Sequence, residues 1–223
     1  MNTLLDSLKI ELTDKLYVKD PESSDLGKRI LSASIEMIHE LGFEQFTFKK
    51  LGTAIGSNES SIYRYFENKH KLLLYLTNWY WGWMELQLVL ATNSIDNSQK
   101  KLHKAIEILT QEIQQDSSYG HINESKLHKI LIEEYSKSFL TKEVDKENKE
   151  GYFMVYKRLA MHLSKMIQSV NSTYPYPSSL ASTILEGSLH QQFLQDHFTS
   201  ITDCNEHVSP TAYFVHLTTN VLK

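Results

Sequence analysis

The chain has 223 residues, of which 41% are hydrophobic, so it is long enough to bury a sizeable core. Cys204 is the only cysteine, which excludes an intrachain disulfide scaffold and favours a reducing, cytoplasmic setting. The formal net charge of −4 argues against a protein that coats nucleic acid.

Apolar residues recur at intervals of three and four along most of the chain, which is the period of an amphipathic helix, and no alternating strand pattern is present. Residues 1–24 are expected to form a short amphipathic helix or a mobile arm. Helices are predicted within 30–41, 47–55, 59–66, 72–90, 102–113, 127–135, 152–170, 178–198 and 209–222. Loops are predicted at 116–122, 141–151, 174–177 and 201–210. No run of about 18 apolar residues or signal peptide is found, so no membrane segment is expected.

Residues 28–76 contain four short helical patterns with the spacing of a helix-turn-helix unit. Gly42 is placed as a helix C-cap, Thr47 as the next N-cap, and Gly56-Ser57-Asn58 as a tight turn before a third helix. Such a turn can lay the third helix in the major groove of DNA. An ordinary pair of helices with a solvated polar face is the alternative. With Ile62 and Phe66 in the core, the residues expected to face outward are Asn58, Glu59, Ser60, Ser61, Tyr63 and Arg64.

Basic residues are concentrated in the same region. Residues 26–75 carry seven lysines and arginines against five acids, a balance of +2, which leaves −6 for the rest of the chain. The first turns of three predicted helices contain cations, which oppose the helix dipole unless an anion binds there. DNA phosphates would meet that need. These cations are Lys28 and Arg29, then Lys49 and Lys50, then Lys69 and Lys71 with His70.

The sequence of residues 30–79, ILSASIEMIHELGFEQFTFKKLGTAIGSNESSIYRYFENKHKLLLYLTNW, resembles the TetR/AcrR family of bacterial transcriptional regulators. The positions that fall on the family pattern are Gly42, Phe43, Thr47, Leu51, Gly56, Ile62, Tyr63, Tyr65, Phe66, Lys69 and Leu72. Ser57, Gly52 and Glu59 depart from it. The agreement covers less than a quarter of the chain.

The resemblance implies that Thr47, Tyr63, Tyr65 and Lys69 position the phosphate backbone and that the start of the third helix reads bases. Glu59 either accepts a hydrogen bond from cytosine or stabilises the helix dipole as an N-terminal acid. Arg64 contacts guanine or phosphate. The division expected is an arm at 1–24, a DNA-binding domain at 25–70 and an effector-binding and dimerisation domain at 71–223.

An effector pocket is predicted from aromatic and flexible side chains beyond residue 70. Its candidate residues are Trp79, Trp83, Tyr152, Tyr156, Met166 and His190, although core packing is the alternative for each. The resemblance implies that an unknown small molecule acts through the helix at 72–90. It also implies a homodimer through residues 178–198 and 209–222, where Ala181, Leu185, Gly187, Ser188 and Leu189 form a small-residue patch.

The function predicted is a repressor released from a palindromic operator in double-stranded DNA by a small-molecule effector. An all-α metal-binding or carrier protein is the alternative, since Glu186, His190 and His197 share one helix face. A family member that acts through a protein partner is a third possibility. No phosphate-binding loop, dinucleotide fingerprint or nucleophile elbow is present, so no enzyme activity, cofactor or metal is predicted.

Overall fold

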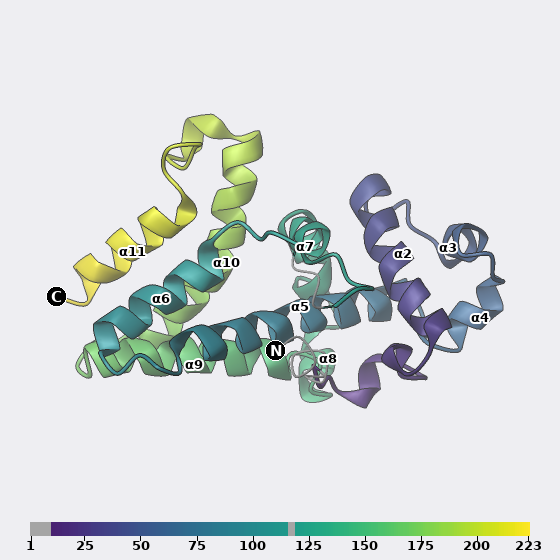
Figure 1. The fold of residues 1–223 in the computed structure, drawn as a ribbon, viewed down its shortest axis with the longest axis horizontal. Helices are drawn as coiled ribbons and strands as arrows, with labels where there is room; N and C mark the ends of the chain where they lie inside the picture. The colour runs from purple at the N-terminus through teal and green to yellow at the C-terminus, as the bar shows by residue number, and fades with distance from the viewer. Residues whose placement is uncertain (1–9, 116–118) are drawn as a thin grey trace. The chain divides into compact units, whose positions relative to one another are not determined.

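The computed structural model describes residues 10–115 and 119–223, and they form helices joined by turns (Figure 1). Within these residues no β-strand occurs and no helix is long and apolar enough to cross a membrane. The all-α prediction is confirmed. Part of the loop predicted at 116–122 lies outside the described residues.

The helices divide between two compact units. The first contains the described residues up to Tyr80 together with Ile113–Met154, and the second contains Trp81–Glu112 and Val155–Lys223. The first unit holds the short 3-10 turns Asp14–Leu16 (η1) and Pro21–Ser23 (η2), and the helices α2 (Asp25–Leu41), α3 (Phe48–Ala54), α4 (Glu59–Tyr63), α7 (Glu124–Phe139) and α8 (Val144–Lys149).

The second unit is built from α6 (Ser98–Thr110), α9 (Met154–Val170, from Val155 onward), α10 (Pro177–His197), the turn η3 (Thr199–Ile201) and α11 (Pro210–Val221). Helix α11 packs on α6 and α10 (Figure 1). The α5 helix (Lys69–Thr92) contributes to both units, and each of its residues from 72 to 85 is buried. A helix that is apolar on every side belongs in a protein interior, which explains why α5 lacks an amphipathic pattern.

The segment 141–151 is predicted as a loop, but the structure contains a short helix there, α8. Its Glu147 is 6% exposed, and its carboxylate lies 2.8 Å from Nε2 of His70 on α5. The mixed charges of this segment therefore do not all face solvent, because one of them pairs inside the first unit.

Residues 10–24 pack against the rest of the first unit. The backbone N–H of Val18 donates to the carbonyl of Tyr65 at 2.8 Å, and the hydroxyls of Ser24 and Tyr65 are 2.8 Å apart. Leu16 is 1% exposed, and Pro21 is also buried. The described part of the arm is therefore held by backbone and side-chain hydrogen bonds and by burial, and Tyr65 makes two of these bonds.

The Tyr65 hydroxyl is expected to stabilise this packing. Replacing Tyr65 with Phe removes its bond to Ser24 while keeping the buried ring, and a hydrogen bond of this kind contributes about 1 kcal/mol. The thermal midpoint should fall by about 2 to 4 °C. Calorimetry checks this, with Tyr176→Phe as the control because Tyr176 is 64% exposed. Equal midpoints for the two variants would show that the Ser24 contact does not hold the arm.

Candidate nucleic-acid interface

The three helices of the predicted helix-turn-helix unit begin and end at capped positions. Gly42 ends α2 with φ of 75°, and its N–H donates to the carbonyl of Ile38. The Thr47 hydroxyl accepts from the N–H of Lys50 at the start of α3. Gly56, with φ of 64°, forms the turn before α4. These caps agree with the sequence prediction, because each residue type satisfies a backbone group that a helix end leaves unpaired.

The α4 helix is short and is capped by Asn58. The Oδ1 atom of Asn58 accepts from the backbone N–H of Ser61 at 2.9 Å and from the hydroxyls of Ser60 and Ser61 at 2.8 and 2.7 Å. Beneath the helix Ile62 and Phe66 are fully buried, as the spacing predicts. The side of α4 that remains exposed is therefore held rigidly by its own cap and core.

Ser61 is predicted to face outward, but the structure places it inward. It is 9% exposed, and its hydroxyl is turned toward Asn58. The residues that the structure leaves at the surface of this segment are Asn58, Ser60, Tyr63 and Arg64, while Ser57 and Glu59 are half-buried.

Tyr63 is an exposed side chain of α4 that is held by neighbouring residues. Its ring is 48% exposed and packs edge-on against Phe48 with ring centres 5.1 Å apart. Its hydroxyl donates to Glu59 Oε1 at 3.3 Å. Glu59 therefore has an intramolecular partner one turn away, and its position in the first turn of α4 also suits the helix dipole. This geometry favours the capping interpretation of Glu59 over direct base contact.

Gly52 allows α3 and α4 to approach closely. A Cβ atom at this position would lie 2.9 Å from the carbonyl oxygen of Ser57 and 3.3 Å from the backbone N of Glu59. Both contacts are with backbone atoms, so no side-chain rotation could relieve them. The departure from the family pattern at Gly52 is thus explained by the tight turn that follows α3.

Several predicted phosphate-binding cations instead have carbonyl partners. The Lys69 ammonium donates to the carbonyls of Phe43, Glu44 and Phe46 at 2.9, 3.1 and 3.3 Å. Arg29 donates to the carbonyl of Ile55, and Lys50 to that of Gln45. Their charges stabilise the turns that carry α3 and α4, and the exposed side chains of Arg29 and Lys50 also reach solvent.

The prediction that three helix starts are cationic is wrong for α2. The α2 helix begins at Asp25 with Ser24 as its N-cap, so Lys28 and Arg29 lie in its second turn behind an acidic first turn. At α5, His70 faces Glu147, and Lys71 contacts Tyr152 and the carbonyl of Lys15. The start of α3, with Lys49 and Lys50, remains the exposed cationic helix start.

Tyr65 is also placed differently from its predicted role at the phosphate backbone. It is 3% exposed, and its hydroxyl bonds to Ser24 and Lys19. The hydrogen bond with Ser24 holds the pKa of this phenol below its ordinary value. The Tyr65 side chain therefore binds the arm. Its contact with Ser24 joins residues that are 41 positions apart, so no local sequence pattern predicts it.

Glu134 on α7 was not identified from the sequence, yet it holds the turn between α2 and α3. Its Oε1 atom accepts from the backbone N–H of Phe43 at 2.8 Å. Lys137 bridges Glu134 and Glu44 at 2.7 and 3.2 Å. Although burial disfavours the charged ammonium, these two carboxylates leave the pKa of Lys137 above its ordinary value. The turn is therefore fixed from α5 by Lys69 and from α7 by Glu134.

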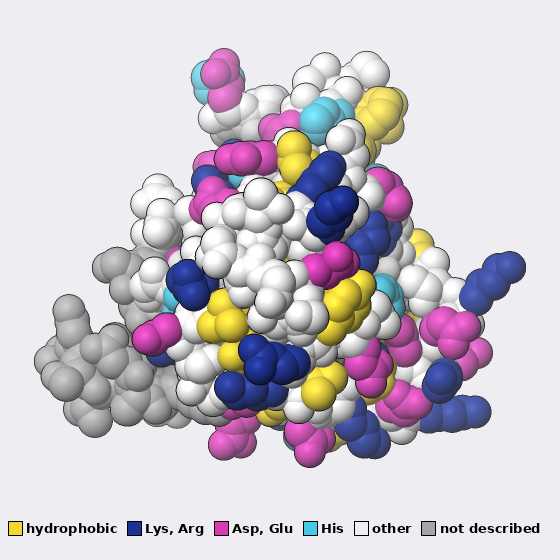
Figure 2. All heavy atoms as spheres, turned by 90° about the vertical axis from the view of Figure 1, so that its right-hand side faces the viewer, with side chains coloured by type: hydrophobic (Ala, Val, Ile, Leu, Met, Phe, Trp, Pro, Cys, Tyr) yellow, Lys and Arg dark blue, Asp and Glu magenta, His cyan; other side chains and the backbone are white. Residues whose placement is uncertain are grey.

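Exposed cationic side chains around α3 and α4 are dispersed. Figure 2 shows lysine and arginine side chains in separate groups on this face, among neutral, hydrophobic and some acidic side chains. Lys28, Lys49 and Arg64 are exposed cations of this region. A surface with separate cations suits contacts with individual phosphates, and it is not a continuous basic groove.

The six predicted effector-pocket residues are divided between the units. Trp79 and Tyr152 belong to the first unit, where Trp79 packs against Tyr119 with ring centres 5.0 Å apart. Trp83, Tyr156, Met166 and His190 belong to the second. Tyr156 donates to Glu186 at 2.6 Å, His190 is exposed, and Met166 lines a cavity. Core packing accounts for the 2% and 4% exposure of Trp79 and Trp83.

Two further predictions about α10 can be compared with the structure. Ala181, Leu185, Ser188 and Leu189 are all buried within the chain, so the small-residue patch predicted for a dimer is not available to a partner. In the described residues no group of three His, Cys, Asp or Glu side chains could hold a metal ion. The helix face shared by Glu186, His190 and His197 therefore does not form such a group.

The region that contains α3 and α4 is similar to a known protein family. Residues 30–76 match the model for bacterial regulatory proteins of the tetR family. A search of curated protein sequences returned no match.

Solved structures resemble the fold over most of the chain. AibR in complex with isovaleryl coenzyme A and operator DNA is 16% identical with a TM-score of 0.59, covering 85% of this chain and 97% of its own. A tetR-family regulatory protein from Rhodococcus RHA1 is 12% identical with a TM-score of 0.61, covering 90% and 96%. A regulator from Saccharomonospora viridis bound to choline is 14% identical with a TM-score of 0.54, covering 86% and 93%.

The contact at Gly52 predicts a stability effect. Gly52→Ala should lower the free energy of unfolding by about 1 to 3 kcal/mol, because the added methyl group must push α3 away from the backbone before α4. Chemical denaturation measures this change. Gly120→Ala is the control, since a Cβ there meets nothing within 4 Å. An unchanged value for Gly52→Ala would mean that the two helices separate freely.

Proposed function

We propose that this chain, a DNA-binding transcriptional regulator of the TetR family, is a repressor that leaves a palindromic operator when a small molecule binds its effector domain. The observation that carries the proposal is the rigid, exposed side of α4. Asn58 caps the helix, Phe48 and Glu59 hold Tyr63, and a buried base of Ile62 and Phe66 supports it. A pre-positioned helix of this kind can enter the major groove without losing much conformational freedom.

The proposed contacts fall into two classes. Asn58 and Ser60, at the N-cap and in the first turn of α4, lie where a recognition helix meets base edges, and Arg64, at the C-cap of α4, would meet a phosphate. Thr47, Lys49, Tyr63 and Lys28 supply donors and positive charge for phosphates. Lys69, Arg29, Lys50 and Tyr65, which bind carbonyls or the arm, act by holding the helices in place. Ser57, Glu59 and Ser61 support the start of α4.

A homodimer would present two copies of α4 to the two halves of a palindrome, about 34 to 36 Å apart. We infer that it forms through the exposed sides of α10 and α11. On α11, Tyr213 and Val221 are 43% and 40% exposed, and the half-buried Leu217 lies between them at a spacing of four residues. An apolar stripe of this spacing forms one helix face and suits packing against its counterpart.

The relatives differ in the molecules named with them, isovaleryl coenzyme A for one and choline for another, so they support a small-molecule effector without specifying it. The two compact units meet within α5 and not at residue 70. We still propose that residues 25–70 bind DNA and that residues 71–223 bind the effector and form the dimer. Residues 10–24 are an arm that packs on the rest of the first unit.

Phosphate contacts are tested with single alanine variants. Lys49→Ala and Arg64→Ala should weaken binding to operator and to unrelated duplex alike, and each should reduce the slope of log affinity against log salt by about 1. Lys100→Ala is the control because Lys100 is an exposed lysine of the second unit. Fluorescence anisotropy at several salt concentrations gives the slopes. Slopes that match the control would remove these residues from the interface.

The dimer is tested with Tyr213→Asp, which introduces a charge into the α11 stripe. Sedimentation velocity at micromolar concentration should show a dimer for the unaltered chain and about half that mass for the variant. Val18→Asp, at a position 61% exposed in the first unit, should stay dimeric. A Tyr213→Asp variant that remains dimeric would place the interface elsewhere.

A further inference from the structure

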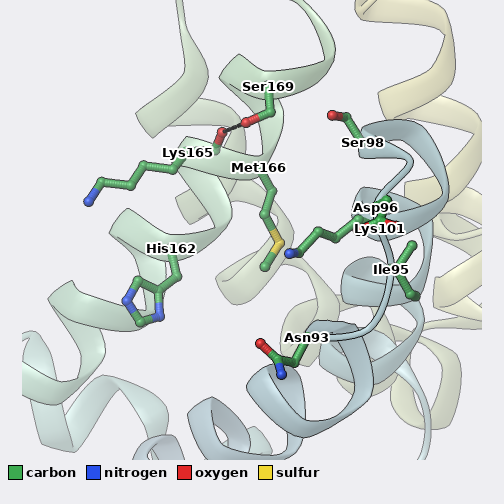
Figure 3. A pocket seen from close by; sticks show the side chains of 9 residues that line it. All are labelled: Asn93, Ile95, Asp96, Ser98, Lys101, His162, Lys165, Met166 and Ser169. Carbon is green, nitrogen blue, oxygen red and sulfur yellow. Dashed lines mark hydrogen bonds between the residues drawn. The ribbon is translucent and has the colours of Figure 1, made fainter.

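The second unit contains a cavity of about 420 Å³ that the sequence analysis did not identify. Its walls come from the turn after α5, the start of α6 and the last turns of α9 (Figure 3). The residues that define its chemistry are Asn93, Ile95, Asp96, Lys101, His162 and Met166. This volume lies in the lower part of the range for small-molecule sites.

Polar and apolar side chains meet in this cavity. Figure 3 shows the Lys101 ammonium, the Asn93 amide and the Met166 thioether turned toward the same space, whereas Lys165 points away from it. Within the described residues the Lys101 ammonium makes no hydrogen bond or ion pair, although Asp96 lines the same cavity. A ligand that fills the space would displace water from the unpaired Lys101 ammonium, and a negatively charged acceptor compensates that loss more strongly than a neutral one.

The edge of the cavity at α9 is fixed by a charged pair. Glu85 on α5 lies 3.4 Å from Nδ1 of His162 and accepts from Arg158 Nε and Nη2 at 2.7 and 2.5 Å. These hydrogen bonds with Glu85 raise the pKa of Arg158 above its ordinary value. Glu85 is thus neutralised by Arg158 and orients His162, so its negative charge does not oppose an anion bound near Lys101.

We propose that this cavity binds a small carboxylate with a short apolar chain. The carboxylate would pair with Lys101 and accept from the Asn93 amide, and the apolar chain would lie against Met166 and Ile95. This assignment rests on the proposed function as a repressor. It specifies where the effector of that repressor would bind and that the effector would be negatively charged. Asn93 directly follows α5, whose first residue, Lys69, holds the turn before α3. A ligand bonded to Asn93 would therefore contact the residue that directly follows α5, the helix whose first residue holds that turn.

The proposal is tested by calorimetric titration of the full-length protein with butanoate and hexanoate at constant ionic strength. The matching amides, butanamide and hexanamide, test the charge, and inorganic phosphate tests binding of any anion. Lys101→Met should weaken carboxylate binding by about tenfold or more, since a hydrogen-bonded ion pair is lost. Lys165→Met is the matched control, because Lys165 lines the cavity from α9 with its ammonium turned away; it should change carboxylate binding by about twofold at most, and Lys101→Arg should restore part of the binding.

Carboxylate binding that depends on Lys101, with little or no binding of the amides, supports the assignment. Equal binding of acids and amides, equal losses for both lysine variants, Lys101-dependent binding of phosphate alone, or no binding of any probe would overturn it. Operator binding of the unliganded protein is measured separately. If the protein binds carboxylates but no operator, the proposed repressor is contradicted and the proposed cavity site is not. If it binds operator but no carboxylate, the cavity site is contradicted and the repressor is not.

Discussion

The turn between α2 and α3 must have its backbone polar groups satisfied before α3 and α4 can be held in position. Lys69 provides one ammonium to three carbonyls of residues 43–46, and Glu134 accepts the N–H of Phe43. Unpaired backbone groups in such a turn would cost free energy and leave several conformations close in energy. The cap at Thr47, the close packing at Gly52 and the exposed side of α4 all depend on this one fixed turn.

Local sequence signals predicted the helix ends and the buried positions of the helix-turn-helix unit correctly. Gly42, Thr47 and Gly56 occur where a backbone conformation or an unpaired N–H demands that residue type, so their roles can be deduced from neighbours within four residues. Ile62 and Phe66 are buried for the same reason, since a helix face repeats at short intervals. Features of this kind need no knowledge of tertiary contacts.

Contacts between distant segments could not be predicted in this way. Glu134 binds Phe43 across 91 residues, and the arm reaches Tyr65 across 41, so no periodic pattern connects them. A lysine at a helix start suggests a phosphate ligand, but the Lys69 ammonium donates to three carbonyls of the chain itself. Likewise the cavity beside Lys101 arises where a turn, α6 and α9 meet, and none of these segments has a distinctive motif.

The central claim is that α4 reads a specific DNA sequence from a twofold-symmetric dimer. Selection of bound duplexes from a random pool, followed by sequencing, tests it most directly. The structure leads us to expect enrichment of a palindrome whose two half-sites are separated by about one helical turn, with enrichment lost when Tyr63 is replaced by Ala. A pool that remains random after repeated rounds at low salt would contradict the claim.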